Sequence, residues 1–251
     1  MSFTGKVVVV VGASSGIGAA TAILFSKESA DVVMVGRNEA KLNDVGNQCK
    51  KYKTPLIIKA DITKDNEARS AIAAAVEKFK RLDVLVNNAG IIHEGTILDG
   101  NILQAYDVVM NTNLRALVHL TSLAAPHLIK TKGSIVNISS ITASSSPIVS
   151  SLVTYYVSKA GLNHFTRCAA LELAPHGIRV NSVSPGPVKT DIVENSGNAS
   201  FTLKDFMAYT PFKRMSEPEE IADLILFLSS DKARSITGSD YVIDNGYLLV
   251  K

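Results

Sequence analysis

The stretch KVVVVVGASSGIG, residues 6–18, places an unbroken apolar run directly before a glycine-rich turn. Lys6–Val11 consists mainly of β-branched valines without polar alternation, which is typical of a strand covered on both faces. Gly12, Gly16 and Gly18 permit a tight turn, and helical spacing follows from Ile17. Backbone N–H groups at the start of such a helix can bind an anion. The unit predicts a site for a dinucleotide pyrophosphate, and a simple turn is the alternative.

Outward from this unit, short β-branched runs alternate with longer segments of helical periodicity. The pattern predicts an α/β fold of Rossmann type, a doubly wound sheet of about seven parallel strands with helices on both faces. The expected strands are Lys6–Val11, Asp31–Val35, Leu56–Ala60, Val84–Asn87, Ser134–Ser139, Arg179–Ser184 and Tyr241–Asp244. The expected helices are Ile17–Lys27, Glu39–Lys51, Asp65–Lys80, Leu103–Lys130 with a break or kink near Asn113 and Pro126, Tyr155–Leu173, and one through Leu228 that begins with a capping box of Ser216 and Glu219.

Length and composition favour one domain over residues 1–251. The chain is 46% hydrophobic and 20% charged, and no Gly/Ser/Pro-rich linker divides it. Two stretches are irregular: a serine-rich loop at Ala143–Thr154 and a long polar segment at Asp191–Arg214. Long irregular segments in compact domains often serve as lids, so we expect residues 191–214 to be a substrate lid.

Charge and cysteine content exclude several classes of partner. The net charge of +3 is small and scattered, which argues against nucleic-acid binding. Cys49 and Cys168 lie far apart without ligand-spaced His or Cys residues, so we expect two reduced thiols and no metal site. The first apolar run is too short for a membrane span or a signal peptide. A soluble, cytoplasmic protein that does not bind membranes is expected.

The end of the second expected strand indicates which dinucleotide is bound. An acidic residue about 20 positions after the glycines would hold the ribose 2′-hydroxyl of NAD. This chain instead has Gly36-Arg37-Asn38. A guanidinium suits a 2′-phosphate, so NADP(H) is favoured over NAD(H). The alternative is that Arg37 is only a solvated charge after a strand.

The segment Tyr155-Tyr156-Val157-Ser158-Lys159 supplies a candidate catalytic pair. Positions i and i+4 lie on one helical face, so Tyr155 and Lys159 can reach one pocket, whereas Ala160 stands four residues after Tyr156. A tyrosine hydroxyl has a pKa of ~10, and a nearby ammonium favours its ionised form. We expect the pair to perform acid/base chemistry at physiological pH.

The glycines have the spacing G-x-x-x-G-x-G, and Asn87-Asn88-Ala89-Gly90 ends a later strand. With Tyr155 and Lys159 following in order, the chain resembles the classical short-chain dehydrogenase/reductase family, most closely its 3-oxoacyl-acyl-carrier-protein reductases and related carbonyl, steroid or polyol dehydrogenases. The resemblance covers essentially the whole chain. It departs at Val11, where the family usually has Thr, at Ser15, where many NADP-dependent members have a basic residue, and at Asn245, where a second glycine is common.

The resemblance implies a catalytic tetrad of Asn113, Ser140, Tyr155 and Lys159. In it, Ser140 orients the substrate carbonyl, Asn113 holds a water in a proton relay, and Ser139 is the alternative to Ser140. The resemblance also implies that Asp61-Ile62 contacts adenine, unless Asp61 caps the next helix, and that Pro185–Thr190 lines the nicotinamide, unless it is only a rigid turn. The cofactor-binding residues expected in total are Gly12, Ser14, Ser15, Gly16, Ile17, Gly18, Arg37, Asn38, Asp61, Ile62, Asn88, Ala89, Gly90, Tyr155, Lys159, Pro185, Gly186, Val188 and Thr190.

These expectations describe an NADP(H)-dependent oxidoreductase that transfers a hydride between nicotinamide and a small ketone or secondary alcohol, with Tyr155 as general acid/base. An NAD(H)-preferring alcohol or steroid dehydrogenase and a non-catalytic dinucleotide sensor on the same fold are the alternatives. The resemblance implies a homo-oligomer, a tetramer or dimer. Which substrate is used is left open.

Overall fold

In the computed structural model, which describes residues 2–196 and 200–250, seven parallel strands form one sheet with the order β3-β2-β1-β4-β5-β6-β7. The expected Rossmann-type α/β fold is therefore confirmed, and each strand end lies within one residue of the expected one. The strands are β1 Val7–Val11, β2 Asp31–Gly36, β3 Leu56–Lys59, β4 Val84–Asn87, β5 Ser134–Ile138, β6 Arg179–Pro185 and β7 Asp240–Ile243.

The valines of β1 show why the strand has no polar alternation. Val7, Val9 and Val11 belong to one hydrophobic core, and Val8 and Val10 belong to the other. Successive side chains of a strand point to opposite faces, so a strand between two helix layers is apolar at every position.

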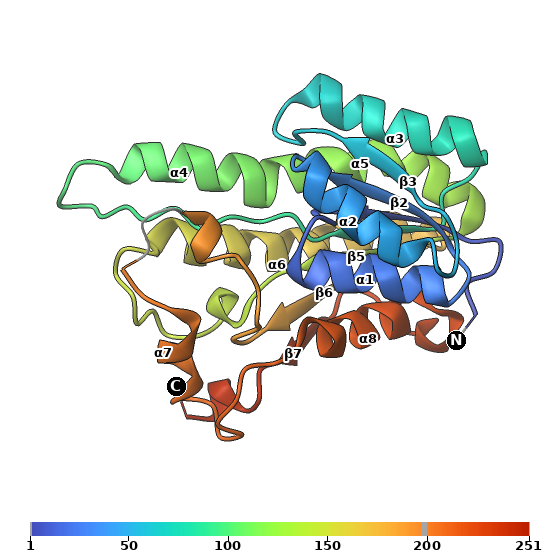
Figure 1. The fold of residues 1–251 in the computed structure, drawn as a ribbon. Helices are drawn as coiled ribbons and strands as arrows, with labels where there is room; N and C mark the ends of the chain where they lie inside the picture. The colour runs from blue at the N-terminus through green and yellow to red at the C-terminus, as the bar shows by residue number, and fades with distance from the viewer. Residues whose placement is uncertain (1, 197–199, 251) are drawn as a thin grey trace.

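Helices cover both faces of the sheet. In Figure 1, α3 and α5 lie on the opposite side of the sheet from α1 and α8. The cores agree, since α3, α5 and α6 contribute to one and α1, α2 and α8 to the other. The helices are α1 Gly16–Lys27, α2 Glu39–Cys49, α3 Asp65–Phe79, α4 Ile102–Met110, α5 Ala116–Thr131, α6 Val153–Leu173, α7 Leu203–Met207 and α8 Pro218–Ser229.

The long helix expected at Leu103–Lys130 is interrupted. A π-helical turn, Asn111–Arg115, joins α4 to α5 and contains Asn113, while Pro126 lies within α5. The expected break at Asn113 is confirmed. Such π-turns are frequently found at functional sites.

The capping box expected at the start of α8 is displaced by one residue. Glu217 is the N-cap and forms the box with Glu220. The Ser216 hydroxyl instead accepts a hydrogen bond from Asn245 Nδ2 at 3.0 Å, and the Ser216 backbone pairs with Pro187 and Lys189. The expectation of Ser216 with Glu219 was wrong because tertiary contacts engage Ser216.

The strand order reverses between β1 and β4, and α1 begins shortly after the carboxyl end of β1. In open α/β sheets, the crevice at the carboxyl ends of strands beside such a reversal is where ligands bind. In the segment expected as a lid, Glu194–Ser196 and α7 are short helices; residues 197–199 of that segment lie outside the described residues. None of the helices within residues 2–196 and 200–250 is both long and apolar enough to cross a membrane.

Candidate active site

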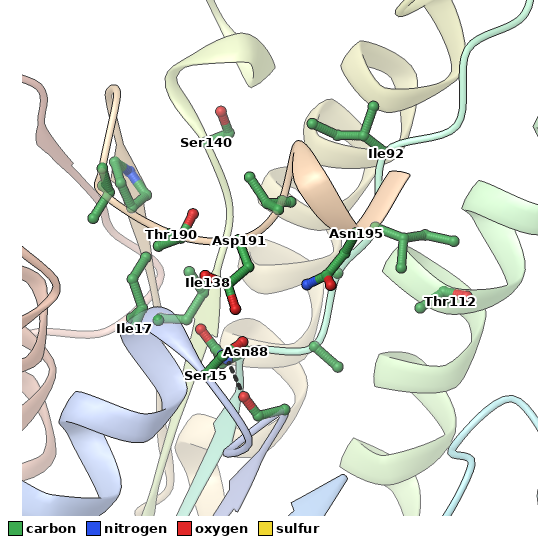
Figure 2. Close-up of a pocket in the computed structure, with 18 of the residues that line it drawn as sticks. Ser15, Ile17, Asn88, Ile92, Thr112, Ile138, Ser140, Thr190, Asp191 and Asn195 are labelled. Atoms are coloured by element: carbon green, nitrogen blue, oxygen red, sulfur yellow. Dashed lines mark hydrogen bonds between the residues drawn. The ribbon is translucent and has the colours of Figure 1, made fainter. Parts of the chain in front are cut away.

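A cavity of about 780 Å³ opens at the carboxyl ends of the strands. In Figure 2, Ser15 and Asn88 lie at one end of it and Ser140 and Ile92 at the other, with Thr190 and Asp191 between. Of the residues expected from the sequence, Gly18 and Asn113 do not line the cavity. Those that do are Gly12, Ser14, Ser15, Gly16, Ile17, Arg37, Asn38, Asp61, Ile62, Asn88, Ala89, Gly90, Ser140, Tyr155, Lys159, Pro185, Gly186, Val188 and Thr190.

Glycine is required in the first turn by both backbone conformation and space. Gly12 has φ +77°, and a Cβ on it would lie 2.9 Å from the backbone of Ala89. The Gly12 N–H donates to Val35 O at 2.8 Å, and Asn88 Nδ2 donates to Gly12 O at 3.0 Å. Hydrogen bonds to β2 and Asn88 therefore hold the loop. The hydroxyl of the threonine that the family usually has at position 11 is absent, because this chain has Val11 there.

The N-terminus of α1 presents its N–H groups to the cavity. Ser15, the N-cap, makes no side-chain capping bond, and the first turn contains no acidic residue. Gly16 has φ +52°, and a Cβ on it would lie 2.8 Å from Thr190 Cγ2. Helix N-termini with free N–H groups and glycine backbone attract phosphate, so this end of the cavity fits a pyrophosphate.

Gly18 packs α1 against the loop. A Cβ there would lie 2.1 Å from Gly12 O and 2.5 Å from Asn88 Nδ2. We expect Gly18→Ala to weaken dinucleotide binding and to destabilise the fold by ~1–3 kcal/mol, because overpacking forces the loop to shift. Gly161→Ala is the matched control, since the atom nearest its new Cβ belongs to the flexible Leu114 side chain at 3.0 Å. Urea unfolding and dinucleotide titration of both variants measure the effect, and equal results for the two would contradict it.

At the ends of β2 and β3, the cavity is lined by charged side chains. Arg37 is exposed there, beside Asp61. Burial raises the pKa of Asp61, but hydrogen bonds from Thr63 and the positive charges of Arg37 and Lys64 together outweigh this effect. The pKa is therefore lowered, and the carboxylate stays ionised. Asp61 does not cap α3, whose N-cap is Lys64.

Lys41 is a lining residue that the sequence reasoning missed. Its ammonium forms an ion pair with Asp191 at 2.7 Å, which joins the first turns of α2 to the start of the 191–214 segment. Its spacing of four residues from Arg37, across a helix start, was the available sequence signal.

Tyr155 and Lys159 lie on one face of α6, inside the cavity. Both are buried, and Lys159 Nζ is 5.6 Å from the centre of the Tyr155 ring. Lys159 Nζ donates to Ile138 O at 2.9 Å, which links the ammonium to the end of β5. The second tyrosine has another task, because the Tyr156 hydroxyl accepts from the Ile148 N–H at 3.2 Å and anchors the serine-rich loop.

The two serines after β5 point to different partners. Ser139 Oγ donates to Lys159 O at 3.2 Å, so it is bound to the α6 backbone. Ser140 Oγ accepts from the Thr142 N–H at 3.2 Å and interacts with Tyr155 by a side-chain hydrogen bond. The bond from Thr142 occupies only an acceptor site of Ser140 Oγ, so its proton is donated to Tyr155 here and can be donated to a substrate oxygen bound beside Tyr155.

Asn113 is fully buried behind the cavity wall. Its Oδ1 accepts from the Ile91 N–H at 2.8 Å, and its Nδ2 donates to Ile91 O at 2.9 Å and to Ser158 Oγ at 3.1 Å. A Cβ on Gly90 would lie 3.4 Å from Lys159 Nζ and 3.7 Å from Asn113 Oδ1. The amide therefore joins the loop after β4 to α6 close to the lysine.

The protonation of the pair differs from the sequence expectation. Burial raises the pKa of Tyr155 to about 12, although the hydrogen bond with Ser140 lowers it. Burial lowers the pKa of Lys159 to about 8. Loss of hydration disfavours both the phenolate and the ammonium, so burial keeps Tyr155 in its neutral form near neutral pH.

The loop after β6 completes the wall opposite α6. Gly186 lies against β7's end, since a Cβ on it would be 2.8 Å from Asp244 Cα. Val188 is buried and pairs with Ser216, while Thr190 lies beside Gly16. Asn245, where a glycine is common in the resembling family, has φ +55°, a conformation that asparagine tolerates better than most residues.

Both cysteines are free thiols: Cys49 is buried and Cys168 exposed. Burial raises the pKa of Cys49 to about 11. Within the described part of the chain, no group of three or more His, Cys, Asp or Glu side chains is arranged to hold a metal ion.

The fold and the glycine cradle define a dinucleotide-binding α/β protein, and comparison with known proteins gives the family. A family model described as Enoyl-(Acyl carrier protein) reductase matches residues 12–248. The chain belongs to the short-chain dehydrogenase/reductase family. It is an oxidoreductase that acts on CH–OH donors, in a family that uses NAD(P).

Relatives and solved structures match over nearly the full length. Dehydrogenase/reductase SDR family member 6 of Xenopus laevis is 35% identical over 98% of both chains. A 3-oxoacyl-acyl-carrier-protein reductase of Thermotoga maritima is 34% identical over 99% of this chain and 100% of its own. A short-chain dehydrogenase/reductase of unknown function from Caenorhabditis elegans, solved with cofactor, is 35% identical, with a TM-score of 0.92 over 99% of this chain and 97% of that one.

Proposed function

We propose that this protein is an NADP(H)-dependent carbonyl reductase and secondary-alcohol dehydrogenase in which Tyr155 is the general acid/base. The observation that carries the proposal is the buried Tyr155 hydroxyl inside the cavity, with Ser140 and Lys159 beside it. A panel of ketones with NADPH, and of secondary alcohols with NADP, tests it. Dinucleotide binding without turnover of any of them would favour a sensing function instead.

A reduced nicotinamide, when bound, supplies a hydride to the carbonyl carbon and is oxidised. Tyr155 donates its proton to the carbonyl oxygen as the carbon–oxygen double bond becomes a single bond. Ser140 donates a hydrogen bond to the same oxygen, which fixes the carbonyl and stabilises developing negative charge. With a pKa of about 12, Tyr155 carries its proton near neutral pH and is in the form that ketone reduction requires.

Lys159 returns the proton to Tyr155. A pKa of about 8 lets the ammonium both lose and regain a proton near neutrality. Its Nζ also faces the cavity near Gly90, where it can bind the nicotinamide ribose. Asn113 positions this end of the site and, in our proposal, holds a water that carries protons towards Lys159.

The cavity fits a dinucleotide along its length. The Gly12–Gly18 turn and Asn88 bind the pyrophosphate, Asp61 and Ile62 contact adenine, and Pro185–Thr190 contacts the nicotinamide. Arg37 with Asn38 favours the 2′-phosphate of NADP(H). The Arg37 side chain is exposed, lines the cavity and makes no hydrogen bond to another described residue, so its guanidinium can bind a phosphate.

We expect Arg37→Ala to raise the Kd for NADPH about tenfold and to leave that for NADH nearly unchanged. A charge-assisted hydrogen bond to phosphate supplies this difference at an exposed position. Arg234→Ala, which removes an exposed arginine outside the cavity, is the control. Fluorescence titration with both dinucleotides measures it; an equal loss for NADH would show that Arg37 does not read the phosphate.

We further propose that residues 1–251 act as one domain, with residues 191–214 as the substrate lid, and that the protein forms a homo-oligomer, a tetramer or dimer. Exposed apolar side chains on α4, α5 and α6 support association, among them Tyr106, Val108, Val118 and Val157. Light scattering on the purified protein tests the oligomeric state.

A further inference from the structure

Apart from Lys159, the charged side chains that line the cavity lie away from Ser140. The charged residues among the described lining residues are Arg37, Glu39, Lys41, Asp61, Lys159 and Asp191. The first four follow β2 and β3, at the end assigned above to the adenosine part of the dinucleotide. Figure 2 shows the Asp191 side chain extending towards Ser15, and its carboxylate is paired with Lys41 at 2.7 Å.

Lys159 does not provide a free cation for a substrate either. Its ammonium is bound to Ile138 O at 2.9 Å, and burial lowers its pKa to about 8. The end of the cavity around Ser140 therefore offers hydroxyl groups and no further charge among its described lining residues. The hydroxyl side chains there include Ser140, Thr142, Ser145, Tyr155 and Tyr247.

The rest of this end is apolar. Ile92, Leu152, Tyr155, Tyr156 and Val193 form a separate hydrophobic cluster, with Ile192, Phe201 and Leu203 packed against it. Phe206 faces Phe201 edge to face, with ring centres 5.5 Å apart, and both line the cavity. Tyr156 contributes its ring only, because its hydroxyl is bound to the Ile148 N–H.

We infer that the substrate is an uncharged ketone or secondary alcohol whose bulk is apolar and lies between the Ile92–Leu152–Tyr156 wall and the lid residues Ile192, Phe201, Leu203 and Phe206. The inference rests on the proposed dehydrogenase function and names its substrate class. A carboxylate or phosphate on the substrate would lose its hydration at this end without gaining a cation. An apolar group of the same size gains about fourfold in affinity for each buried methylene.

Octan-2-one and 7-oxooctanoate make a matched test pair, because they have the same carbon chain and differ by a terminal carboxylate. We expect kcat/KM with NADPH to be roughly 100-fold or more higher for octan-2-one, since the carboxylate remains unpaired. The methyl ester of 7-oxooctanoate should regain most of the difference. Equal or better turnover of 7-oxooctanoate would overturn the inference and leave the dehydrogenase function intact.

A pair of variants locates the effect in the lid. Phe206→Arg should reduce the ratio of kcat/KM for octan-2-one to kcat/KM for 7-oxooctanoate at least about tenfold, because it adds a cation to the apolar wall. Phe206→Ala should lower activity with octan-2-one and leave 7-oxooctanoate no better, because it removes apolar area only. An unchanged ratio in Phe206→Arg would show that the chain end does not reach this wall.

Binding gives a readout that does not depend on turnover. Calorimetric titration of each ketone into the Tyr155→Phe variant with NADPH bound should show tighter binding of octan-2-one. If neither ketone is reduced by the unaltered protein, but this binding preference is observed, the proposed function is contradicted. The preference of the Ser140 end of the cavity for an uncharged, apolar group is then still supported. If 7-oxooctanoate binds as tightly as octan-2-one, the inference on substrate class is wrong.

Discussion

Replacement of Tyr155 by phenylalanine is expected to lower kcat by roughly 1,000-fold or more while dinucleotide binding is retained. General acid/base groups contribute about 100- to 10,000-fold, and no other described hydroxyl shares the position of Tyr155 beside Lys159 and Ser140. The ring of Tyr155 belongs to the hydrophobic cluster against which Ile192, Phe201 and Leu203 pack, and phenylalanine keeps that packing. Steady-state turnover of octan-2-one with NADPH and fluorescence titration of NADPH separate chemistry from binding.

Tyr156→Phe is the matched control for this variant. It removes a neighbouring hydroxyl that anchors Ile148 of the serine-rich loop and lies outside the Tyr155–Lys159 pair. We expect it to retain kcat within about tenfold, with a small rise in KM as the loop loosens. Near-normal kcat in Tyr155→Phe, or loss of catalysis only in Tyr156→Phe, would refute the assignment of the acid.

The pKa of Tyr155 also predicts opposite pH dependences for the two reaction directions. Because burial raises that pKa to about 12, Tyr155 carries its proton throughout the range from pH 6 to pH 9. Ketone reduction, which consumes the proton, should vary little from pH 6 to pH 8. Alcohol oxidation needs Tyr155 or its relay to accept a proton, so kcat/KM should rise through the pKa of about 8 of Lys159. Oxidation that falls between pH 7 and pH 9 would contradict this order of proton transfer.

The fold was predictable because local and global patterns agree. The valines of β1 are apolar at every position since each face of the sheet has its own helix layer, and periodicity reports such burial directly. The glycine turn was equally readable. At Gly12 and Gly16 the positive φ and the close contacts to Ala89 and Thr190 leave no room for a side chain, so residue type alone marked the positions.

What sequence reasoning missed depends on contacts between distant segments. The Lys41 ammonium lines the cavity, where it is paired with the carboxylate of Asp191, 150 residues later in the chain. Ser216 is bound to Asn245 and therefore leaves the cap of α8 to Glu217. The protonation of Tyr155 follows from its burial, and a Tyr-x-x-x-Lys spacing contains no information about burial. Each of these outcomes is set by three-dimensional packing.

The apolar end of the cavity illustrates the same limit. Residues 191–214 were expected to be a lid from their length and polarity. Of the six described residues of this segment that line the cavity, Asp191 and Asn195 are polar and four are apolar: Ile192, Phe201, Leu203 and Phe206. Only the three-dimensional structure shows that apolar side chains of this segment pack against the same cluster, which contains Tyr155 and Tyr156.

Replacement of Lys159 by methionine is expected to abolish most activity and at the same time to stabilise the fold. Burial lowers the pKa of Lys159 from 10.5 to about 8, which corresponds to about 3 kcal/mol less favourable charge in the folded state. Methionine has a similar length and fills the space without charge. Loss of the bond to Ile138 O costs about 1 kcal/mol, so we expect a net gain of about 2 kcal/mol at pH 7. Urea unfolding and steady-state kinetics measure the two effects.

The pH dependence separates removal of a buried charge from better packing. The folded pKa of Lys159 is below the unfolded value, so between about pH 8 and pH 10.5 the unfolded chain binds more protons and the unaltered protein gains stability as pH rises. The advantage of Lys159→Met should therefore shrink by about 1 kcal/mol from pH 7 to pH 9. Tyr155 does not interfere, because its raised pKa affects stability only above about pH 10. Lys232→Met, at an exposed position, should change stability at neither pH, and an advantage of Lys159→Met that is independent of pH would show that packing, not charge, limits stability at this site.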